Sequence, residues 1–193
     1  MKKLTIGFAM TGSFCTFEKA FAQMEELVKR GYEVLPVLSF NAAEMDTRFM
    51  SAREVRERMQ HLTGRDPIDS LAAAEPIGPK RLCDVYVMAP VTGNSLSKLA
   101  HGQFDTPALL GAKSHLRNEN PLILAVSTND GLGSAAQNIG RLLQWRHTYF
   151  VPFGQDDPVK KPRSLVADFE QIPRTIAAAL AGIQLQPMLI GSK

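Results

Sequence analysis

The chain begins with an apolar run that predicts a buried strand. Apolar character is almost unbroken from Leu4 to Met10, as in central parallel strands that are covered on both faces. The segment Thr11-Gly12-Ser13 supplies a turn, and apolar side chains then recur every three or four residues, at Phe14, Phe17, Phe21, Met24 and Val28. This spacing indicates a helix with one buried stripe, which Gly31 ends.

The same patterns predict further elements along the chain. Apolar runs predict strands at Glu33 to Leu38, Asp84 to Ala89 (ended by Pro90), Leu122 to Ser127 and Tyr149 to Val151. Capping signals and helical spacing predict helices after Ser51 (with Glu54 completing a capping box), from Asp66-Pro67, over Ser95 to Ala100, from Thr106-Pro107, around Ile139 to Leu143, and from Leu165 to Leu180, where Pro173 kinks or splits the helix.

Strands that alternate with helices predict a doubly wound parallel sheet. We therefore expect an α/β fold of the Rossmann-like or flavodoxin-like type, with three αβα layers in a single domain over residues 1–193. Its core would span about residues 3–182, and residues 183–193 would form a C-terminal tail. In such sheets ligands bind beyond the carboxyl ends of the strands, near the point where the strand order reverses.

Composition and charge narrow the class of protein but do not name a function. The 193 residues are 45% hydrophobic and 21% charged, which is typical of a globular chain. The net charge of +3 comes from basic residues that are spread along the sequence, whereas a nucleic-acid surface needs a concentrated basic face. We expect neither nucleic-acid binding nor a membrane-spanning segment.

The two cysteines and the first residues bear on the cellular compartment. Cys15 and Cys83 are far apart and resemble neither a disulfide framework nor a zinc site, so a reducing cytoplasm and no metal are expected. Lys2-Lys3 precedes an apolar run that is short for a signal peptide and lacks a small-residue cleavage site. That run is better interpreted as the buried first strand.

The turns after the strands carry the candidate chemistry. The first turn has neither the G-x-G-x-x-G dinucleotide fingerprint nor the phosphate-binding loop of nucleotide triphosphatases. The turns at 11–14, 39–43, 90–95 and 127–133 are instead rich in small, hydroxyl and amide residues. Such residues allow backbone N–H groups to surround an anion.

Two of these turns together carry a family resemblance. Thr11-Gly12-Ser13 after the first strand, with Pro90-Val91-Thr92-Gly93-Asn94-Ser95 and Lys98 after a later one, resembles the homo-oligomeric flavin-containing decarboxylase-like flavoproteins. The resemblance extends from Leu4 to about Leu143. It implies an FMN site whose cofactor-binding residues are Thr11, Gly12, Ser13, Ser39, Pro90, Thr92, Asn94, Ser95, Thr128 and Asn129.

One branch of this family, from spore-forming bacteria, is especially similar in its opening residues and at Ser127-Thr128-Asn129-Asp130. This resemblance implies one component of an oxidoreductase that converts a dihydro precursor into a pyridine dicarboxylate in the cytoplasm of the mother cell. It also implies a larger partner protein that binds NAD or NADP, and a homo-oligomer built as a trimer or a multiple of it.

Two alternatives stay open on the sequence. The first is flavin-dependent decarboxylation of a cysteine-containing substrate, but the cysteine-containing flap motif and a clearly placed catalytic histidine of such decarboxylases are not recognisable. The second is a non-catalytic structural role in which the chain organises the partner. A dicarboxylate substrate would need cationic or donor groups, for which Lys98, His101 and His115 are the candidates; the catalytic base is not identified.

Overall fold

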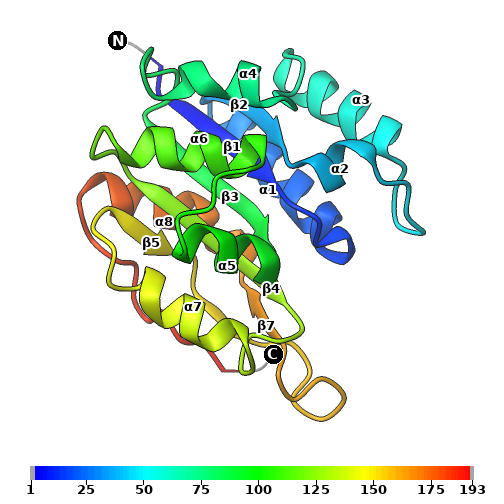
Figure 1. Ribbon diagram of the computed structural model, residues 1–193, viewed down its shortest axis with the longest axis vertical. Helices are drawn as coiled ribbons and strands as arrows, with labels where there is room; N and C mark the ends of the chain where they lie inside the picture. Colours follow the sequence, from blue (N-terminus) through cyan, green and yellow to red (C-terminus); the bar gives the residue numbers. More distant parts are fainter. Residues whose placement is uncertain (1–2, 192–193) are drawn as a thin grey trace.

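The first apolar run forms strand β1 (Thr5–Met10), the central strand around which the sheet is built. A computed structural model describes residues 3–191, and these form one seven-stranded sheet flanked by two layers of helices (Figure 1). β1 pairs in parallel with β2 (Glu33–Leu38) on one side and with β3 (Val85–Val91) on the other. β4 (Leu122–Thr128) and β5 (Thr148–Phe150) continue the parallel sheet in the order 2-1-3-4-5.

The strand order places a topological switch point between β1 and β3. The chain leaves β1 for β2 on one side and then returns across the sheet to β3 on the other. A crevice opens beyond the carboxyl ends of strands wherever successive connections diverge in this way. The expected doubly wound three-layer αβα fold is confirmed, and the site is expected beyond β1 and β3.

Helices cover both faces of the sheet. α4 (Leu71–Ala74), α5 (Gly93–Ala100), α6 (Pro107–Leu116) and α7 (Ala135–Leu142) form one layer, whereas α1 (Phe17–Lys29), α3 (Ala52–Thr63) and α8 (Ile172–Leu180) form the other (Figure 1). α2 (Phe40–Glu44) follows β2 directly, and short 3₁₀ turns lie at Phe14–Thr16, Glu75–Ile77 and Phe169–Gln171. In residues 3–191 we find no helix with the length and apolar character needed to cross a lipid bilayer.

Several predicted boundaries are confirmed by hydrogen bonds. Ser51 and Glu54 form the capping box at the start of α3. The Thr106 hydroxyl accepts the Leu109 N–H at the start of α6, with a proline in the first turn. Gly31 follows α1 at φ 85°, a left-handed conformation that glycine adopts without a steric penalty.

Two sequence predictions about the middle of the chain need correction. No helix begins at Asp66-Pro67: Ile68 instead forms a bridge with Val37, and α4 begins only after Ser70, whose side chain accepts the Ala73 N–H. Ser70 is a better helix cap than Asp66 because its hydroxyl accepts a hydrogen bond from an N–H group of the first helical turn. β3 also continues past Pro90 to Val91.

The C-terminal region differs most from the prediction. Leu165–Ala167 is not helix but strand β7, which runs antiparallel to the end of β4 and to β6 (Phe153–Gln155). Helix α8 begins only at Ile172, so Pro173 lies in its first turn and neither kinks nor splits it. A first-turn N–H has no helical partner, and proline is therefore tolerated there.

The tail, residues 183–191 in the described part, packs on β6. The N–H of Phe153 donates to the carbonyl of Met188, and the N–H of Ile190 donates to the carbonyl of Phe153.

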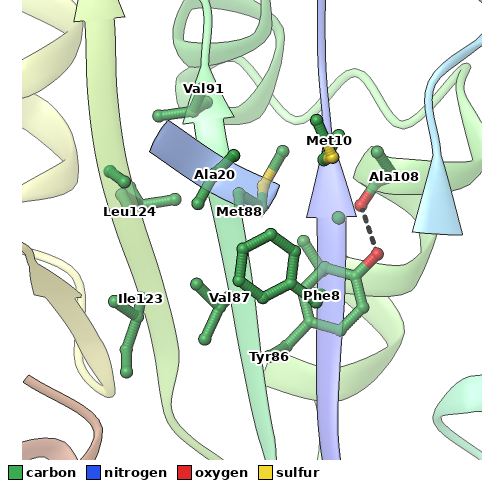
Figure 2. Close-up of a cluster of buried hydrophobic side chains, with 14 of the residues drawn as sticks. Phe8, Met10, Ala20, Tyr86, Val87, Met88, Val91, Ala108, Ile123 and Leu124 are labelled. Atoms are coloured by element: carbon green, nitrogen blue, oxygen red, sulfur yellow. Dashed lines mark hydrogen bonds between the residues drawn. The ribbon is translucent and has the colours of Figure 1, made fainter. Parts of the chain in front are cut away.

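The largest fully buried side chain, Tyr86, marks the contact between the sheet and α6. Its hydroxyl donates to the carbonyl of Ala108 at 3.0 Å, as Figure 2 shows among the surrounding apolar side chains. Two glycines make room for the ring: a Cβ at Gly7 would stand 2.6 Å from its Cδ2, and a Cβ at Gly111 would stand 2.4 Å from its hydroxyl. α6 is thus fixed against β3 by close contact as well as by burial.

Candidate functional site

A hollow of about 290 Å³ lies at the predicted switch point. Residues after β1, β2 and β3 meet there with the start of α6. Its lining residues are Gly12, Ser39, Phe40, Asn41, Thr92, Asn94, Ser95, Lys98, Asp105, Thr106 and Leu109. Six of the predicted residues, counting Lys98, therefore share one hollow.

Free backbone donors give this hollow the character of an anion site. Within residues 3–191 the N–H groups of Gly12, Gly93 and Asn94 make no hydrogen bond. Gly93 and Asn94 begin helix α5, and the Thr92 hydroxyl caps that helix by accepting the Ser95 N–H at 3.1 Å. The positive end of α5 and its unpaired N–H groups would together stabilise a phosphate or carboxylate.

Gly12 keeps the floor of the hollow open. A Cβ at this position would meet Asn41 Cβ at 3.5 Å and Phe14 Cε2 at 3.6 Å, which are ordinary contacts. Any larger side chain at position 12 would extend beside Asn41, a lining residue. The residues present thus leave space, and provide donors, for the phosphate end of a mononucleotide.

Thr11 supports the hollow without lining it. Its side chain is buried, and its hydroxyl donates to the Pro90 carbonyl at 2.9 Å and accepts the Thr92 N–H at 3.1 Å. These bonds connect the turn after β1 to the end of β3, at Pro90, and to the turn that follows it, at Thr92. Thr11 and Pro90 therefore position Gly12 and Thr92, and the Thr11 hydroxyl is already engaged.

Ser13 takes part in a separate hydroxyl cluster beside the hollow. Its hydroxyl lies 2.8 Å from the Ser127 hydroxyl and donates to the Ser127 carbonyl, and the Thr16 hydroxyl lies 3.2 Å from the same Ser127 oxygen. This cluster connects the turn after β1 to the end of β4. Ser13 is not among the lining residues.

Thr128 is the last residue of β4 and Asn129 begins the loop that follows it; neither lines the hollow. A Cβ at Gly93 would stand 2.8 Å from the Thr128 hydroxyl, so Thr128 packs against the start of α5. Asn129 is exposed. The loop is at the same edge of the sheet, one strand further along.

The hollow contains one ion pair. Lys98 Nζ lies 2.7 Å from an oxygen of Asp105, and about a quarter of the Lys98 side chain is exposed (26%). An incoming anion would compete with Asp105 for this ammonium group. Sequence reasoning proposed Lys98 but missed Asp105, Thr106 and Leu109, because α6 follows another helix and not a strand. The predicted cap at Thr106 was the available signal, since it marks a further helix start.

The two histidines proposed for substrate lie outside the hollow. His101 follows α5 at its far end, is exposed, and has Nδ1 2.8 Å from the Ser97 carbonyl. His115 is 1% exposed near the amino ends of the strands, where its Nε2 lies 3.0 Å from the Pro121 carbonyl. His115 is therefore not placed to contact a substrate in the hollow, because it is enclosed at the opposite edge of the sheet.

His115 instead makes the fold sensitive to acid. Burial lowers its pKa from 6.5 to about 4, although the Pro121 carbonyl acts in the opposite direction. Its other ring nitrogen, Nδ1, lies 3.5 Å from Cys83 Sγ, and burial raises the pKa of that thiol to about 12. Both groups are therefore neutral at pH 7.

We expect a stability loss on acidification that depends on His115. Below about pH 6.5 the His115 imidazole takes up a proton in the unfolded chain but stays neutral in the folded protein. The folded protein therefore has its full stability above about pH 6.5 and loses stability as the pH falls towards 4. The expected loss is on the order of 3 kcal/mol in the free energy of unfolding.

Urea unfolding of the wild type, His115→Leu and the exposed-residue control His61→Gln between pH 7.5 and 4.5 measures this loss. Only His115→Leu should reduce the dependence of the free energy of unfolding on pH. An equally steep profile in all three proteins would contradict the assignment.

Among residues 3–191 no group of three or more His, Cys, Asp or Glu side chains is placed to hold a metal ion. The hollow itself contains one carboxylate, Asp105, and that carboxylate is paired with Lys98. The donor set therefore suits an organic anion.

Comparison with known proteins agrees with this chemistry. The family model described as Flavoprotein matches residues 1–162. The chain belongs to the Flavoprotein family. It is 49% identical over 190 residues to the B subunit of dipicolinate synthase from Bacillus subtilis (strain 168), covering 98% of this chain and 95% of that protein.

Two solved structures place this Flavoprotein member within its fold. The crystal structure of the dipicolinate synthase B subunit from Bacillus halodurans is 45% identical, with a TM-score of 0.90 and complete coverage of both chains. The FMN-dependent cysteine decarboxylase SpaF is 21% identical, with a TM-score of 0.65 over 92% of this chain and 95% of that chain. The second likeness concerns the fold alone. The Flavoprotein match ends before β7 and α8, which the two Bacillus comparisons do cover.

Proposed function

We propose that this chain is the FMN-binding small subunit of a dipicolinate synthase. With a nicotinamide-binding partner, the A subunit of dipicolinate synthase, it would oxidise a dihydrodipicolinate-type precursor to dipicolinate in the cytoplasm of a sporulating cell. The observation that carries the proposal is the hollow of about 290 Å³ at the β1/β3 switch point, because two of its lining residues, Gly12 and Asn94, have unpaired N–H groups. We also propose a homo-oligomeric assembly, as a trimer or a multiple of it.

Residues in and beside the hollow would make different contributions to cofactor binding. Asn94 and its neighbour Gly93 would donate backbone N–H groups to the phosphate. Ser39, Thr92 and Ser95 keep the helix starts in place through their caps and hydroxyl contacts. Thr128 and Asn129 remain our candidates for contact with the flavin ring, because they lie at the carboxyl end of β4, at the same edge of the sheet.

FMN, when bound, supplies a two-electron acceptor. The protein's own contribution is to bind and orient the anionic groups. A dicarboxylate substrate needs cationic or N–H donors, and Lys98 in the hollow is the cation that the structure offers for this role. Its carboxylate partner Asp105 would then be left to solvent, where more than half of its side chain is already exposed (57%).

Two measurements test the proposal. The freshly purified chain should either show flavin absorbance or quench FMN fluorescence with saturable binding. Dipicolinate should then form only when both proteins and FMN are combined, and not from the nicotinamide-binding partner alone.

Absence of any FMN binding would refute the flavin assignment. Full activity of the partner alone would favour a structural role for this chain. Release of carbon dioxide from a peptidyl or pantothenoyl cysteine would instead favour decarboxylation.

A further inference from the structure

A second concave surface lies at the opposite edge of the sheet from the hollow. This open groove, of about 600 Å³, is formed by α6, by Phe104 in the loop before α6, and by the loop between α7 and β5. The loop reaches the amino end of β4, since the Leu122 N–H donates to the carbonyl of His147 at 2.8 Å. No residue lines both the groove and the hollow, although Phe104 of the groove directly precedes Asp105 of the hollow in the chain.

The floor of the groove is aromatic and aliphatic. Phe104, Leu116 and Trp145 line it, and each is a partly buried side chain packed against the core. Trp145 is the single tryptophan of the chain. Within residues 3–191 its indole N–H makes no hydrogen bond, so it is a free donor beside an apolar surface. Half-covered aromatic groups with a free polar end are typical of binding surfaces.

Three cations surround this floor. Lys113 lies 6.0 Å from the centre of the Phe104 ring, and Arg117 and Arg146 are exposed at the rim. In the described part of the chain none of the three forms an ion pair. Glu119 is the one acidic lining residue, and His147 also contributes to the rim. The charge of the groove is thus clearly positive, with three cations against one carboxylate.

We propose that this groove docks an acidic segment of a partner protein, one that places an aromatic or aliphatic side chain against Trp145 between flanking carboxylates. Charge complementarity selects this occupant: carboxylates would pair with Arg117 and Arg146, whose forked donors suit them. A second copy docking through the same face in a two-fold arrangement would oppose like charges. A small molecule in so open a groove would leave much of its surface in water.

The docking proposal rests on the proposed function in one respect, which is that the chain has a partner protein. Partner binding and FMN binding are measured separately, so the two proposals can fail independently. We compare binding of the purified dipicolinate synthase A subunit to the full chain, to Arg117→Gln/Arg146→Gln and to Arg117→Glu/Arg146→Glu. The matched control is Lys160→Glu/Arg174→Glu, which reverses two exposed cations outside the groove. FMN binding and urea stability are measured on every variant.

Docking in the groove predicts that the glutamine pair weakens binding of the partner by about tenfold and the glutamate pair by more, whereas the control pair changes it little. Wild-type binding should weaken with added salt, and the partner should shift Trp145 fluorescence. FMN binding should be the same in all variants. Loss of FMN binding with intact docking would count against the flavin site alone.

Four results would overturn the docking proposal. They are no binding of the partner, equal binding by all variants, equal weakening in the control pair, and a change in the size of the homo-oligomer in the groove variants without the partner. The last result would assign the groove to contacts between copies of this chain.

Discussion

Gly12→Asp is expected to lower FMN affinity by at least about a hundredfold, because it places a carboxylate where the phosphate should bind. The fold should tolerate the change, since a Cβ at this position meets its neighbours at 3.5 Å or more. FMN titration by fluorescence quenching measures the affinity, and thermal unfolding checks the fold. Part of the loss should disappear at high salt, which screens the repulsion.

The matched control for this variant is Gly12→Asn, which adds nearly the same volume without the charge. It should weaken FMN binding less than Gly12→Asp does. If the aspartate variant folds and binds FMN as tightly as the wild type, the phosphate does not lie at the turn after β1, and the proposed cofactor orientation is wrong.

Gly111→Ala is expected to destabilise the protein, whereas Gly140→Ala should stabilise it. Both glycines lie inside helices, but a Cβ at Gly111 would stand 2.4 Å from the Tyr86 hydroxyl, while a Cβ at Gly140 meets nothing within 4 Å. Overpacking should cost about 1–3 kcal/mol at Gly111. The gain in helix propensity should contribute about 0.5–1 kcal/mol at Gly140.

Urea unfolding measures both changes, and Tyr86→Phe supplies the decisive cross-check. Removing the hydroxyl relieves the closest contact, so Tyr86→Phe/Gly111→Ala should be less destabilised than the sum of the two single variants. Additive losses would mean that the clash with the ring hydroxyl does not limit the packing of α6 on β3.

The sequence predicts well whatever depends on local pattern. The apolar run of β1 and the capping box at Ser51 depend on residues that are close together in the sequence, and each is found as expected. The alternation of strands and helices is sufficient to predict the carboxyl edge of the sheet as the site.

Features that depend on distant segments could not be predicted in the same way. Strand β7 has three residues and exists because the end of β4 extends beyond β5 and leaves an unpaired edge. Helix α6 starts beside the hollow and runs to the opposite edge of the sheet. His115 is near the end of this helix and therefore lies far from the hollow. Asp105 belongs to the site because it forms an ion pair with Lys98, and no local sequence motif predicts this pair.

The double hydrogen bond of Thr11 has a kinetic consequence. Because one hydroxyl fixes the turn after β1 to the turn after β3, the two turns are already ordered before any ligand arrives. The conformational entropy of this preorganisation is lost during folding and not during association. Binding of the cofactor should therefore be a single fast phase whose rate rises linearly with concentration, and Thr11→Val should introduce a slower ordering step.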